Sequence, residues 1–532
     1  MIMKSRIYLN AMVLMVLAFV CSCSNEDILQ ETTTEGTTRW TITGQGGFSD
    51  DGTTRSVSMG GNNGVTMYYH WEAGEQVAVY NSSNTQVGTL TATPLSYTTA
   101  QAEFTGYADL TGSFTPGQKL TYYMPNATFD FTGQDGTLAN ISSKYDYETA
   151  EVEVKSVVSV GADYHIAEMG YASFVPSYKL IRMKLKDEDG NWIRPVQVTI
   201  SAKSGKLLQQ KTLGPSGWNK TYGNIVVNLE KKDGMYPYEF FIALCSDTNE
   251  SDEYFITAKT EDGTIYWNTG EANKWTTTYA DGGYAAVTRT MSADGVDLGI
   301  EVNGKRILWA PVNVGASVPW ELGDFFAWGE TEPKTDYSWS TYKWCNGANY
   351  KFTKYNTRTN YGTVDNKEVL DPEDDAAHVN MVGDWYMPTR DELNALFATK
   401  SNTTDYTWES TTANDHNGWR ITQNSTGNNI FLPAAGHFDG ARFVNAGTYG
   451  YYWSSSLGTP YPDDAWNLFV SSDLDADMYC IDRYDGCSVR GVQRVKSDIS
   501  SRPIYGDGSS DWDQSDITGR SSYGEGSPWS QE

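Results

Sequence analysis

The sequence predicts a mainly β protein, in which tandem β-sandwiches are followed by a smaller α+β unit. Its 532 residues exceed the usual domain length of about 100–200 residues several times over, so three folded units are expected. Aromatic residues make up 13% of the chain and glycines number 50, and this composition favours strands and turns over helices. One clear helix start lies among many short strand patterns in the last third, which is typical of an α+β domain.

The N-terminus predicts a lipoprotein signal peptide over residues 1–22. Lys4 and Arg6 precede an apolar run at residues 11–20, which is shorter than the roughly 20 residues that cross a membrane. The run ends in a sequence that resembles a bacterial lipobox, with an aliphatic residue three positions before Cys23 and a small residue directly before it. Cys23 is therefore expected to carry the lipid, and an ordinary secretory signal is the alternative.

The charges and cysteines of the chain indicate its cellular location, its partners and how its fold is stabilised. The acidic stretch at residues 24–27 resembles the export signal that sends Bacteroidetes lipoproteins to the outer face of the outer membrane. We therefore expect a lipid anchor in the outer membrane and a chain that faces the cell exterior. A formal charge of −28 argues against nucleic acid as a partner, because nucleic acids bind basic patches. With only six cysteines, the fold is expected to hold by packing rather than by disulfides.

Residues 23–46 are expected to form a tether, since threonine and glutamate prevail there. After them, apolar and polar residues alternate. Residues 65–71 and 76–80 flank a Glu-Ala-Gly-Glu turn, as in a half-buried hairpin. Further short strands, with turn signals between them, are expected at residues 119–124, 180–185, 198–200 and 225–229. Such a series is typical of β-sandwiches.

Two of these segments resemble the fimbrillin family of Bacteroidetes surface proteins. Residues 71–80 are similar to the Trp-containing hairpin of the family, and residues 120–125 are similar to its tyrosine-rich strand that ends in proline. The resemblance covers roughly residues 40–290 and implies tandem transthyretin-like β-sandwiches, over residues 47–165 and 166–290. Some members of the family polymerise into pili by donating a strand to a neighbour.

The same resemblance bears on pilus assembly. Arg39 and Arg55 lie near the places where an arginine-specific protease trims pilus subunits, although an arginine in a linker usually has no such role. A pilin also needs a C-terminal donor strand, and here another domain follows. A shaft subunit is therefore not expected, whereas a tip subunit, an anchor and a stand-alone surface protein all stay open.

The C-terminal domain is expected over residues 291–496. Thr389 and Glu392 form a capping-box pattern, in which each side chain bonds a free backbone N–H at a helix start. The apolar residues of the buried helix face are Leu393, Leu396 and Phe397. Strands are expected at residues 430–433, 451–453 and 466–470.

This domain resembles the Fibrobacter succinogenes major paralogous domain, a module of secreted and lipid-anchored proteins. Short glycine and aromatic motifs match it in order, at residues 296–299, 308–310, 313–316, 323–330, 374–377, 383–389, 432–436, 452–456 and 488–490. The family looks related to C-type-lectin-like folds, in which a few strands and one or two helices support long loops. The resemblance therefore implies an α+β C-type-lectin-like domain, a class used mainly for binding.

The sequence carries no motif of a cofactor-dependent or metal-dependent enzyme. Its five histidines include no HExxH pair, no CxxC follows the signal peptide, and there is no P-loop or GxSxG elbow. We therefore expect a non-catalytic protein. A carbohydrate-active enzyme is a disfavoured alternative, which would need two carboxylates that face each other across a cleft.

Cys480 and Cys487 are a candidate catalytic pair, because C-type-lectin-like folds include the enzyme that generates formylglycine, which uses a reactive cysteine pair. Their surroundings indicate a hairpin with its turn near residues 483–484. The two thiols would then face each other across the strands and form a structural disulfide or stay inert. Arg490 is expected to be structural, in an ion pair with an internal carboxylate.

One stretch combines the residue types that bind sugars. Aromatic rings stack on the apolar faces of sugars, Asp and Asn bind hydroxyl groups, and calcium prefers oxygen ligands. The candidate ligand-binding residues are Trp453, Tyr461, Asp463, Asp464, Trp466 and Asn467. The alternative is that Trp453 and Trp466 are core residues of consecutive strands. Residues 463–467 depart from the Trp-Asn-Asp calcium motif of lectins, so calcium stays open and no other cofactor is implied.

Residues 497–532 contain few aliphatic residues and are expected to be a disordered tail. Together these features predict a cell-surface lipoprotein that acts as a non-catalytic adhesin or ligand-binding protein. Its expected partners are the outer-membrane lipid and a glycan or host protein, and nucleic acid is not expected. The alternative is a tip or anchor component of a fimbrillin-type pilus, which binds other pilus subunits by donor-strand exchange.

Overall fold

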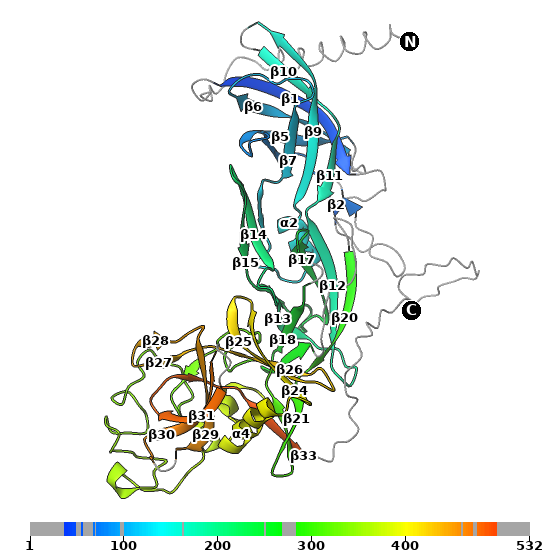
Figure 1. The fold of residues 1–532 in the computed structure, drawn as a ribbon. Helices are drawn as coiled ribbons and strands as arrows, with labels where there is room; N and C mark the ends of the chain where they lie inside the picture. Colours follow the sequence, from blue (N-terminus) through cyan, green and yellow to red (C-terminus); the bar gives the residue numbers. More distant parts are fainter. Residues whose placement is uncertain are drawn as a thin grey trace, which may run out of the picture.

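The computed structural model describes residues 37–48, 55–56, 68–69, 71–95, 101–161, 164–248, 252–268, 284–458, 461–471 and 476–496. The fold is mainly β, as expected, with 52% strand and 7% helix. Three units follow one another along an elongated body, from β1 near one end to the C-terminal sheets at the other (Figure 1). The expected signal peptide, the lipidated Cys23 and the tail at residues 497–532 lie outside the described residues.

In the part of the chain that is described, no helix combines the length and the apolar character needed to cross a membrane.

The first unit is an eight-stranded sheet that closes on itself. Its strands are β1 (Thr38–Phe48), β4 (Gln76–Tyr80), β5 (Gln86–Pro94), β6 (Gln101–Leu110), β7 (Lys119–Met124), β9 (Glu148–Val160), β10 (Tyr164–Met169) and β11 (Ala172–Pro176). They follow the order β10-β1-β11-β9-β7-β4-β5-β6, and β1 also pairs with β6, so the two ends of the sheet meet. β1 runs antiparallel to β6 and parallel to β10 and β11. A separate short pair joins β2 (Arg55–Ser56) to β3 (Tyr68–Tyr69).

β1 begins inside the segment expected to be a tether. Residues 38–46 belong to this strand, and Trp40 and Ile42 are buried in the core. The threonines that indicated a flexible segment are themselves good strand formers, because a β-branched side chain suits a pleated surface. Arg39, which was expected in a linker, lies in β1 and forms an ion pair with Asp109 at 3.0 Å.

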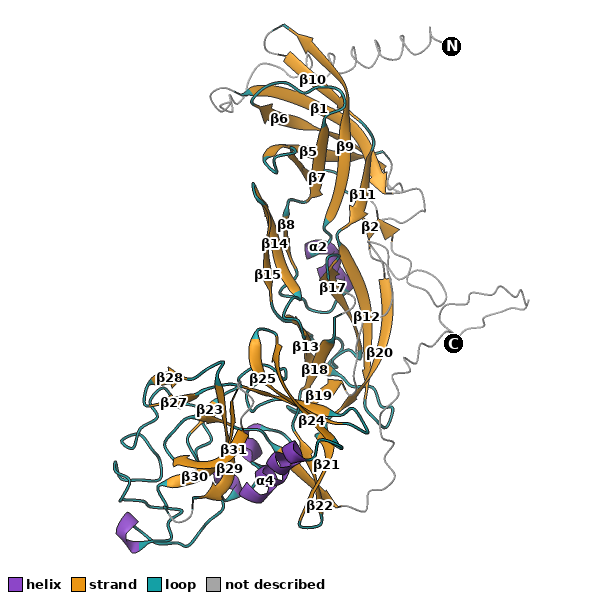
Figure 2. Cartoon of the chain, viewed as in Figure 1, coloured by secondary structure: helices purple, strands orange, loops and turns teal. Residues whose placement is uncertain are grey.

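The second unit pairs a seven-stranded sheet with a three-stranded one (Figure 2). The larger sheet, in the order β16-β13-β18-β19-β20-β12-β17, consists of β12 (Tyr178–Lys186), β13 (Pro195–Ala202), β16 (Ile225–Asn228), β17 (Glu239–Cys245), β18 (Tyr254–Thr260), β19 (Ile265–Asn268) and β20 (Tyr284–Ser292). The smaller sheet, in the order β15-β14-β8, consists of β8 (Thr128–Asp130), β14 (Leu208–Gly214) and β15 (Gly217–Tyr222). β10 spans the expected boundary between residues 165 and 166, and β8 lies in the segment expected to form the first sandwich but pairs with β14 of the second unit.

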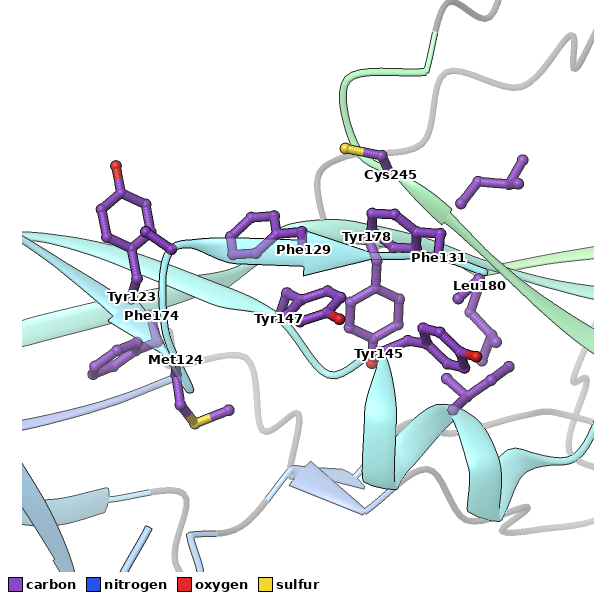
Figure 3. Close-up of a cluster of buried hydrophobic side chains, with 14 of the residues drawn as sticks. Tyr123, Met124, Phe129, Phe131, Tyr145, Tyr147, Phe174, Tyr178, Leu180 and Cys245 are labelled. Atoms are coloured by element: carbon purple, nitrogen blue, oxygen red, sulfur yellow. The ribbon is translucent and has the colours of Figure 1, made fainter. Parts of the chain in front are cut away.

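The segment between β7 and β9, which contains β8 and α2 (Leu138–Lys144), joins the first two units into one core. Its aromatic side chains gather against the seven-stranded sheet of the second unit (Figure 3). Phe129 stacks on Tyr147 at 4.6 Å, and Phe131 meets the same ring edge-on at 5.5 Å. Gln134 is 1% exposed, and its Nε2 donates to the carbonyl oxygens of Phe131 and Ala243, while its Oε1 accepts from Ala243 N–H. This segment therefore holds the first two units together.

The third unit contains small sheets connected by long loops. One sheet has the order β21-β22-β33, with β21 (Val296–Val302), β22 (Lys305–Trp309) and β33 (Val492–Lys496). A five-stranded sheet has the order β23-β32-β29-β30-β31, with β23 (Phe325–Phe326), β29 (Tyr449–Leu457), β30 (Asp464–Ser471), β31 (Ala476–Asp482) and β32 (Cys487–Ser488). The remaining strands are β24 (Tyr406–Ala413), β25 (His416–Gln423) and β26 (Asn429–Pro433) in one sheet, and β27 (His437–Asp439) with β28 (Arg442–Val444) in a hairpin. Because β22 pairs with β33, the two ends of the unit lie together.

Short helical segments accompany these sheets. They are η1 (Thr359–Tyr361), η2 (Pro372–Asp374), α3 (Ala376–Asn380), α4 (Arg390–Ala398) and η3 (Thr399–Ser401). α4 begins with the expected capping box, since Thr389 Oγ1 accepts from Glu392 N–H and the Glu392 carboxylate accepts from Thr389 N–H. Leu393 and Leu396 are buried, and Phe397 is partly buried against the same core. These features agree with the helix predicted from the sequence.

The third unit docks on the second through aromatic side chains. Trp320 packs edge-on against Phe255 with ring centroids 6.2 Å apart, and its Nε1 donates to Ser201 Oγ at 3.2 Å. Trp385 meets Trp267 at 5.9 Å. The third unit is therefore packed against its neighbour rather than only tethered to it.

The partners of Arg490 differ from those expected. The side chain is buried, as a structural role requires, but Nε donates to Asn313 Oδ1 at 2.9 Å, and the other nitrogens donate to the carbonyl oxygens of Ala310 and Phe431. The predicted ion pair with an internal carboxylate was therefore wrong. Neutral oxygens satisfy the guanidinium donors, and burial lowers the pKa of Arg490 to about 10.

Candidate ligand-binding site

The six candidate residues of the sequence do not form one site, because successive residues of a strand point to opposite faces. Trp453 and Asn467 lie opposite each other on β29 and β30 and are fully buried. Trp453 Nε1 donates to the carbonyl oxygen of Phe326, and Asn467 Nδ2 donates to that of Tyr479. Because they are buried, these two residues belong to the core and cannot contact a ligand. For Trp453 this agrees with the alternative that it is a core residue of a strand.

Asp464 and Trp466 lie on the other face of β30. Trp466 is half-buried under the guanidinium of Arg390, at 4.1 Å from the ring centroid. Arg390 begins α4, so this tryptophan sits where the helix meets the sheet. Asp464 stands directly opposite Asp482 on β31, and burial together with the charges of Asp463 and Asp482 raises the pKa of Asp464 to about 6. The carboxylate therefore titrates close to neutral pH.

Tyr461 and Asp463 occupy the loop that leads into β30. Tyr461 is 55% exposed, and the Arg358 guanidinium lies 6.0 Å from its ring centroid. Asn349 Nδ2 donates to Asp463 Oδ2 at 3.3 Å. Burial and then the charge of Asp463 raise the pKa of Tyr361, whose ring therefore lies near this carboxylate. We call the surface formed by Arg358, Tyr361, Tyr461, Asp463 and Asp464 the loop edge.

A buried arginine holds the loop edge in place. Arg483 lies in the turn after β31, and its Nη1 donates to Pro462 O at 2.9 Å, while its backbone N–H donates to Asp463 O at 2.9 Å. The guanidinium stacks on the rings of Trp328 and Phe352, with its central carbon 4.8 and 4.4 Å from the ring centroids. The loop therefore has its backbone fixed, while the side chain of Tyr461 is exposed and Asp463 is partly buried, with Oδ1 covered and Oδ2 bonded by Asn349.

Sequence reasoning missed Asn349, Arg358 and Tyr361, which lie about a hundred positions before the stretch that was singled out. The local signal was present, since residues 346–362 contain no valine, leucine, isoleucine or methionine but several Asn, Tyr, Lys and Arg residues. A loop of this composition is exposed and rich in binding groups. What the sequence alone could not provide was the contact between this loop and residues 461–464.

The carboxylates of the loop edge offer calcium no preformed site. In the described part of the chain, the acidic group whose ligand oxygens converge within 4.8 Å is Asp371, Glu373 and Asp374. Lys354 Nζ already lies 2.6 Å from both Asp371 and Asp374, so an ammonium group takes the position that a cation would need. Calcium binding therefore has no support from the arrangement of these acidic side chains.

The expected hairpin between Cys480 and Cys487 was wrong. The tight turn is present, since Asp485 N–H donates to Asp482 O, but the chain then enters β32, and two strands, β29 and β30, separate β32 from β31. Three strand spacings of about 4.8 Å exceed the roughly 7 Å that a disulfide spans between Cα atoms. Both thiols are free, and burial raises the pKa of Cys480 to about 12 and that of Cys487 as well, so neither is reactive at neutral pH.

Comparison with known proteins gives no family for the chain. No family model matches it, and no curated protein matches it. It is similar to a putative cell adhesion protein from Bacteroides uniformis, with 15% identity over 49% of this chain and 94% of that chain and a TM-score of 0.28. A putative cell adhesion protein from Bacteroides ovatus has 12% identity over 47% and 94%, with a TM-score of 0.27. A tip fimbrial protein from Porphyromonas gingivalis has 8% identity over 44% and 83%, with a TM-score of 0.21.

Proposed function

We propose that the chain is a non-catalytic adhesion protein of the cell surface, anchored in the outer membrane through lipid on Cys23. Its C-terminal domain, of C-type-lectin-like fold, binds a glycan or a protein ligand. The support for this fold is the helix α4, which begins with a capping box and lies on a small sheet, with long loops beside it. The first two units are the stalk, in agreement with their closed sheet and shared core.

The observation that carries the proposal is the composition of the loop edge. An exposed tyrosine, Tyr461, lies beside an arginine and two carboxylates on a backbone that Arg483 fixes. Ring faces stack on the apolar face of a sugar, and the exposed Arg358 supplies hydrogen bonds to hydroxyl groups. A fixed backbone lowers the entropy that binding must remove, which favours affinity.

The experiment is a glycan array probed with the full chain after removal of the signal peptide, with and without calcium. Binding that is lost in Tyr461→Ala and retained in Tyr107→Ala would support the loop edge as the site. Tyr107 is a matched control, because it is a similarly exposed tyrosine in the first unit. Circular dichroism of each variant checks that the fold is intact. Absence of glycan binding in both conditions would contradict the glycan form of the proposal and leave a protein as ligand.

A second candidate function is a tip or anchor component of a pilus, favoured by the position of β1. This N-terminal strand lies between β6 on one side and β10 and β11 on the other, so its removal would expose two unpaired edges. A strand from another subunit could then be added by β-augmentation. A labelled peptide with the sequence of β1 should bind the chain that lacks residues 24–48 and should not bind the intact chain. Equal binding to both would refute this function.

A further inference from the structure

Four aromatic rings form a continuous stripe on the five-stranded sheet. Phe469 of β30 is the centre, with the rings of Tyr449, Tyr451 and Tyr479 at 5.2, 5.3 and 5.5 Å from its centroid. Leu468, which points the other way, packs with the buried residues of α4, so the stripe lies on the face that α4 leaves uncovered. Tyr479 is 46% exposed, and the other three rings are partly exposed. We call these four residues the aromatic stripe.

The aromatic stripe differs from several other exposed aromatic residues in that no cation of the described chain lies over its rings. Several exposed rings have a Lys or Arg of the same chain over the ring: Tyr107 has Arg39, Trp192 has Lys184, Tyr238 has Arg194, Tyr350 has Lys351 and Tyr461 has Arg358. Among the described residues, no Lys or Arg lies over a ring of the stripe. Its ring faces, which carry negative electrostatic potential, are therefore free to meet a cation from another molecule.

One side of the stripe carries a carboxylate that is unpaired in the described part of the chain. Asp477 lies directly opposite Phe469 on the neighbouring strand, is exposed, and forms no ion pair with any described residue. On the other side, the bridge between Phe438 and Gly486 sets Asp439 opposite Asp485. Asp485 is 9% exposed, and burial together with the charges of Asp482 and Asp439 raises its pKa to about 8, so this carboxyl adds little charge at neutral pH. Arg442 pairs with Asp439 on the exposed side at 2.6 Å.

The histidine beside the stripe adds no positive charge. The His437 ring lies 4.5 Å from that of Tyr451, and burial lowers the pKa of His437, so the imidazole is neutral at pH 7. Its Nδ1 is buried and has no partner among the described residues. The stripe is thus a surface of ring faces, with the exposed Asp477 carboxylate on its β31 side and a neutral imidazole on its β29 side.

We propose that the aromatic stripe binds a lysine or arginine side chain of a partner polypeptide. A cation over these rings would gain cation–π attraction, and the Asp477 carboxylate would add Coulomb attraction. A sugar could stack on the rings and donate hydroxyl hydrogen bonds to Asp477, but only a cation gains both of these electrostatic attractions, which is why a basic polypeptide fits better. The −28 charge of the chain would also steer a basic partner toward it. The stripe lies on the face of β30 opposite to Asp464 and Trp466, so this binding does not depend on the loop edge.

The test measures binding of a fluorescent peptide of alternating lysine and serine to the full chain without its signal peptide, at physiological salt. The same peptide with every lysine acetylated keeps the length but loses the charge. Tyr479→Leu keeps an apolar side chain and removes the ring, and Asp477→Asn removes one carboxylate without touching the core. The matched controls in the first unit are Tyr107→Leu, whose ring already has Arg39 above it, and Glu72→Gln, an exposed acidic residue.

The expected result is that Tyr479→Leu and Asp477→Asn each weaken binding of the charged peptide by about two- to fivefold, whereas the controls stay within about 1.5-fold. The acetylated peptide should bind much more weakly to every variant. Equal losses in Glu72→Gln and Asp477→Asn would mean general attraction to an acidic protein and would overturn the proposal. Binding of the acetylated peptide as strong as that of the charged peptide would also overturn it. So would binding of a glycan that is lost in Tyr479→Leu, if the peptide does not bind at all. Loss of the loop-edge ligand in Tyr461→Ala with unchanged peptide binding would separate the two sites.

Discussion

Replacement of Gln134 by alanine should uncouple the first two units. The side chain is 1% exposed and makes three hydrogen bonds, from Nε2 to Phe131 O at 2.9 Å, from Nε2 to Ala243 O at 2.8 Å, and from Ala243 N–H to Oε1 at 2.8 Å. Each bond contributes about 1 kcal/mol net, and a buried backbone group left without a partner costs about 1–3 kcal/mol. We therefore expect Gln134→Ala to lower the free energy of unfolding by about 3–5 kcal/mol, a large share of the roughly 5–15 kcal/mol that stabilises a domain.

The location of these bonds explains why the effect should fall on the second unit. Ala243 lies on β17, an edge strand of the seven-stranded sheet, and Gln134 O accepts from Asn228 N–H on β16, the other edge strand. One residue of the β7–β9 connection therefore bridges both edges of the second sheet. Alanine keeps the backbone carbonyl that Asn228 N–H bonds, so the substitution should expose the amides of β17 to solvent more than those of β16, while the first sheet remains closed.

Urea unfolding followed by tryptophan fluorescence measures the loss of stability, and hydrogen exchange reports on the amides of β16 and β17. Because a chain of several units need not unfold in two states, the exchange measurement decides which unit responds. Gln197→Ala is the matched control, since this glutamine bonds Asn228 Oδ1 on the same sheet but at an exposed position, and it should cost less than about 0.5 kcal/mol. If Gln134→Ala lowers the free energy of unfolding by less than about 1 kcal/mol and leaves hydrogen exchange in β17 unchanged, Gln134 does not hold the first two units together.

Three further predictions concern the third unit. Arg483→Lys should destabilise the third unit by about 3–5 kcal/mol, because an ammonium cannot reproduce the bonds to Tyr342 Oη and to the carbonyl oxygens of Lys354, Tyr355 and Pro462. Thermal unfolding measures this loss of stability. A melting temperature equal to that of the wild type would contradict the prediction. Thr389→Ala should cost about 1 kcal/mol by removing the cap of α4, whereas Thr412→Ala, at an exposed strand position, should cost less than half of that in the same denaturation assay. Burial, together with the charges of Asp482 and Asp439, raises the pKa of Asp485 to about 8, so the folded state keeps a proton that the unfolded state releases, and stability should fall as pH rises from about 4 to about 8. Asp485→Asn should flatten this part of the profile of melting temperature against pH, and the variant should be more stable than the wild type above about pH 8. An unchanged profile would exclude the Asp485 carboxyl as the source of this pH dependence.

Local signals in the sequence predicted local structure well. The capping box of Thr389 and Glu392 needs only four residues, and α4 begins where it was expected. The strands expected at residues 430–433, 451–453 and 466–470 lie within β26, β29 and β30. The turn near residues 483–484 was also expected correctly, but the pairing of the strands around it was not. A turn fixes the direction of a few residues, whereas the partner of a strand depends on segments far away in the chain.

Most of what was missed is long-range pairing of this kind. β1 joins β6 across more than fifty residues, and β8 joins β14 across about eighty, and no pattern within either segment specifies its partner. The candidate site shows the same limit. Tyr461 and Asp463 were found by composition, but the exposure of one side chain and the burial of its neighbour depend on which face of the sheet is covered. Trp453 and Trp466 have the same residue type and similar surroundings in the sequence, yet one is in the core and the other lies under Arg390.

Two buried arginines explain how a unit with so much loop can hold a rigid binding surface. A loop leaves many carbonyl oxygens without strand or helix partners, and each buried one needs a donor. A guanidinium offers five donors in a plane, and Arg483 and Arg490 donate to five backbone carbonyl oxygens between them, as well as to Tyr342 Oη and Asn313 Oδ1. The cost of burying each charge is offset by these bonds, and for Arg483 also by the rings of Trp328 and Phe352. Arg483 donates directly to the loop that carries Tyr461 and Asp463, whereas Arg490 donates to residues 310, 313 and 431, outside the loop edge. A substitution at Arg483 should therefore weaken ligand binding at the loop edge more than a substitution at Arg490 that costs the same stability.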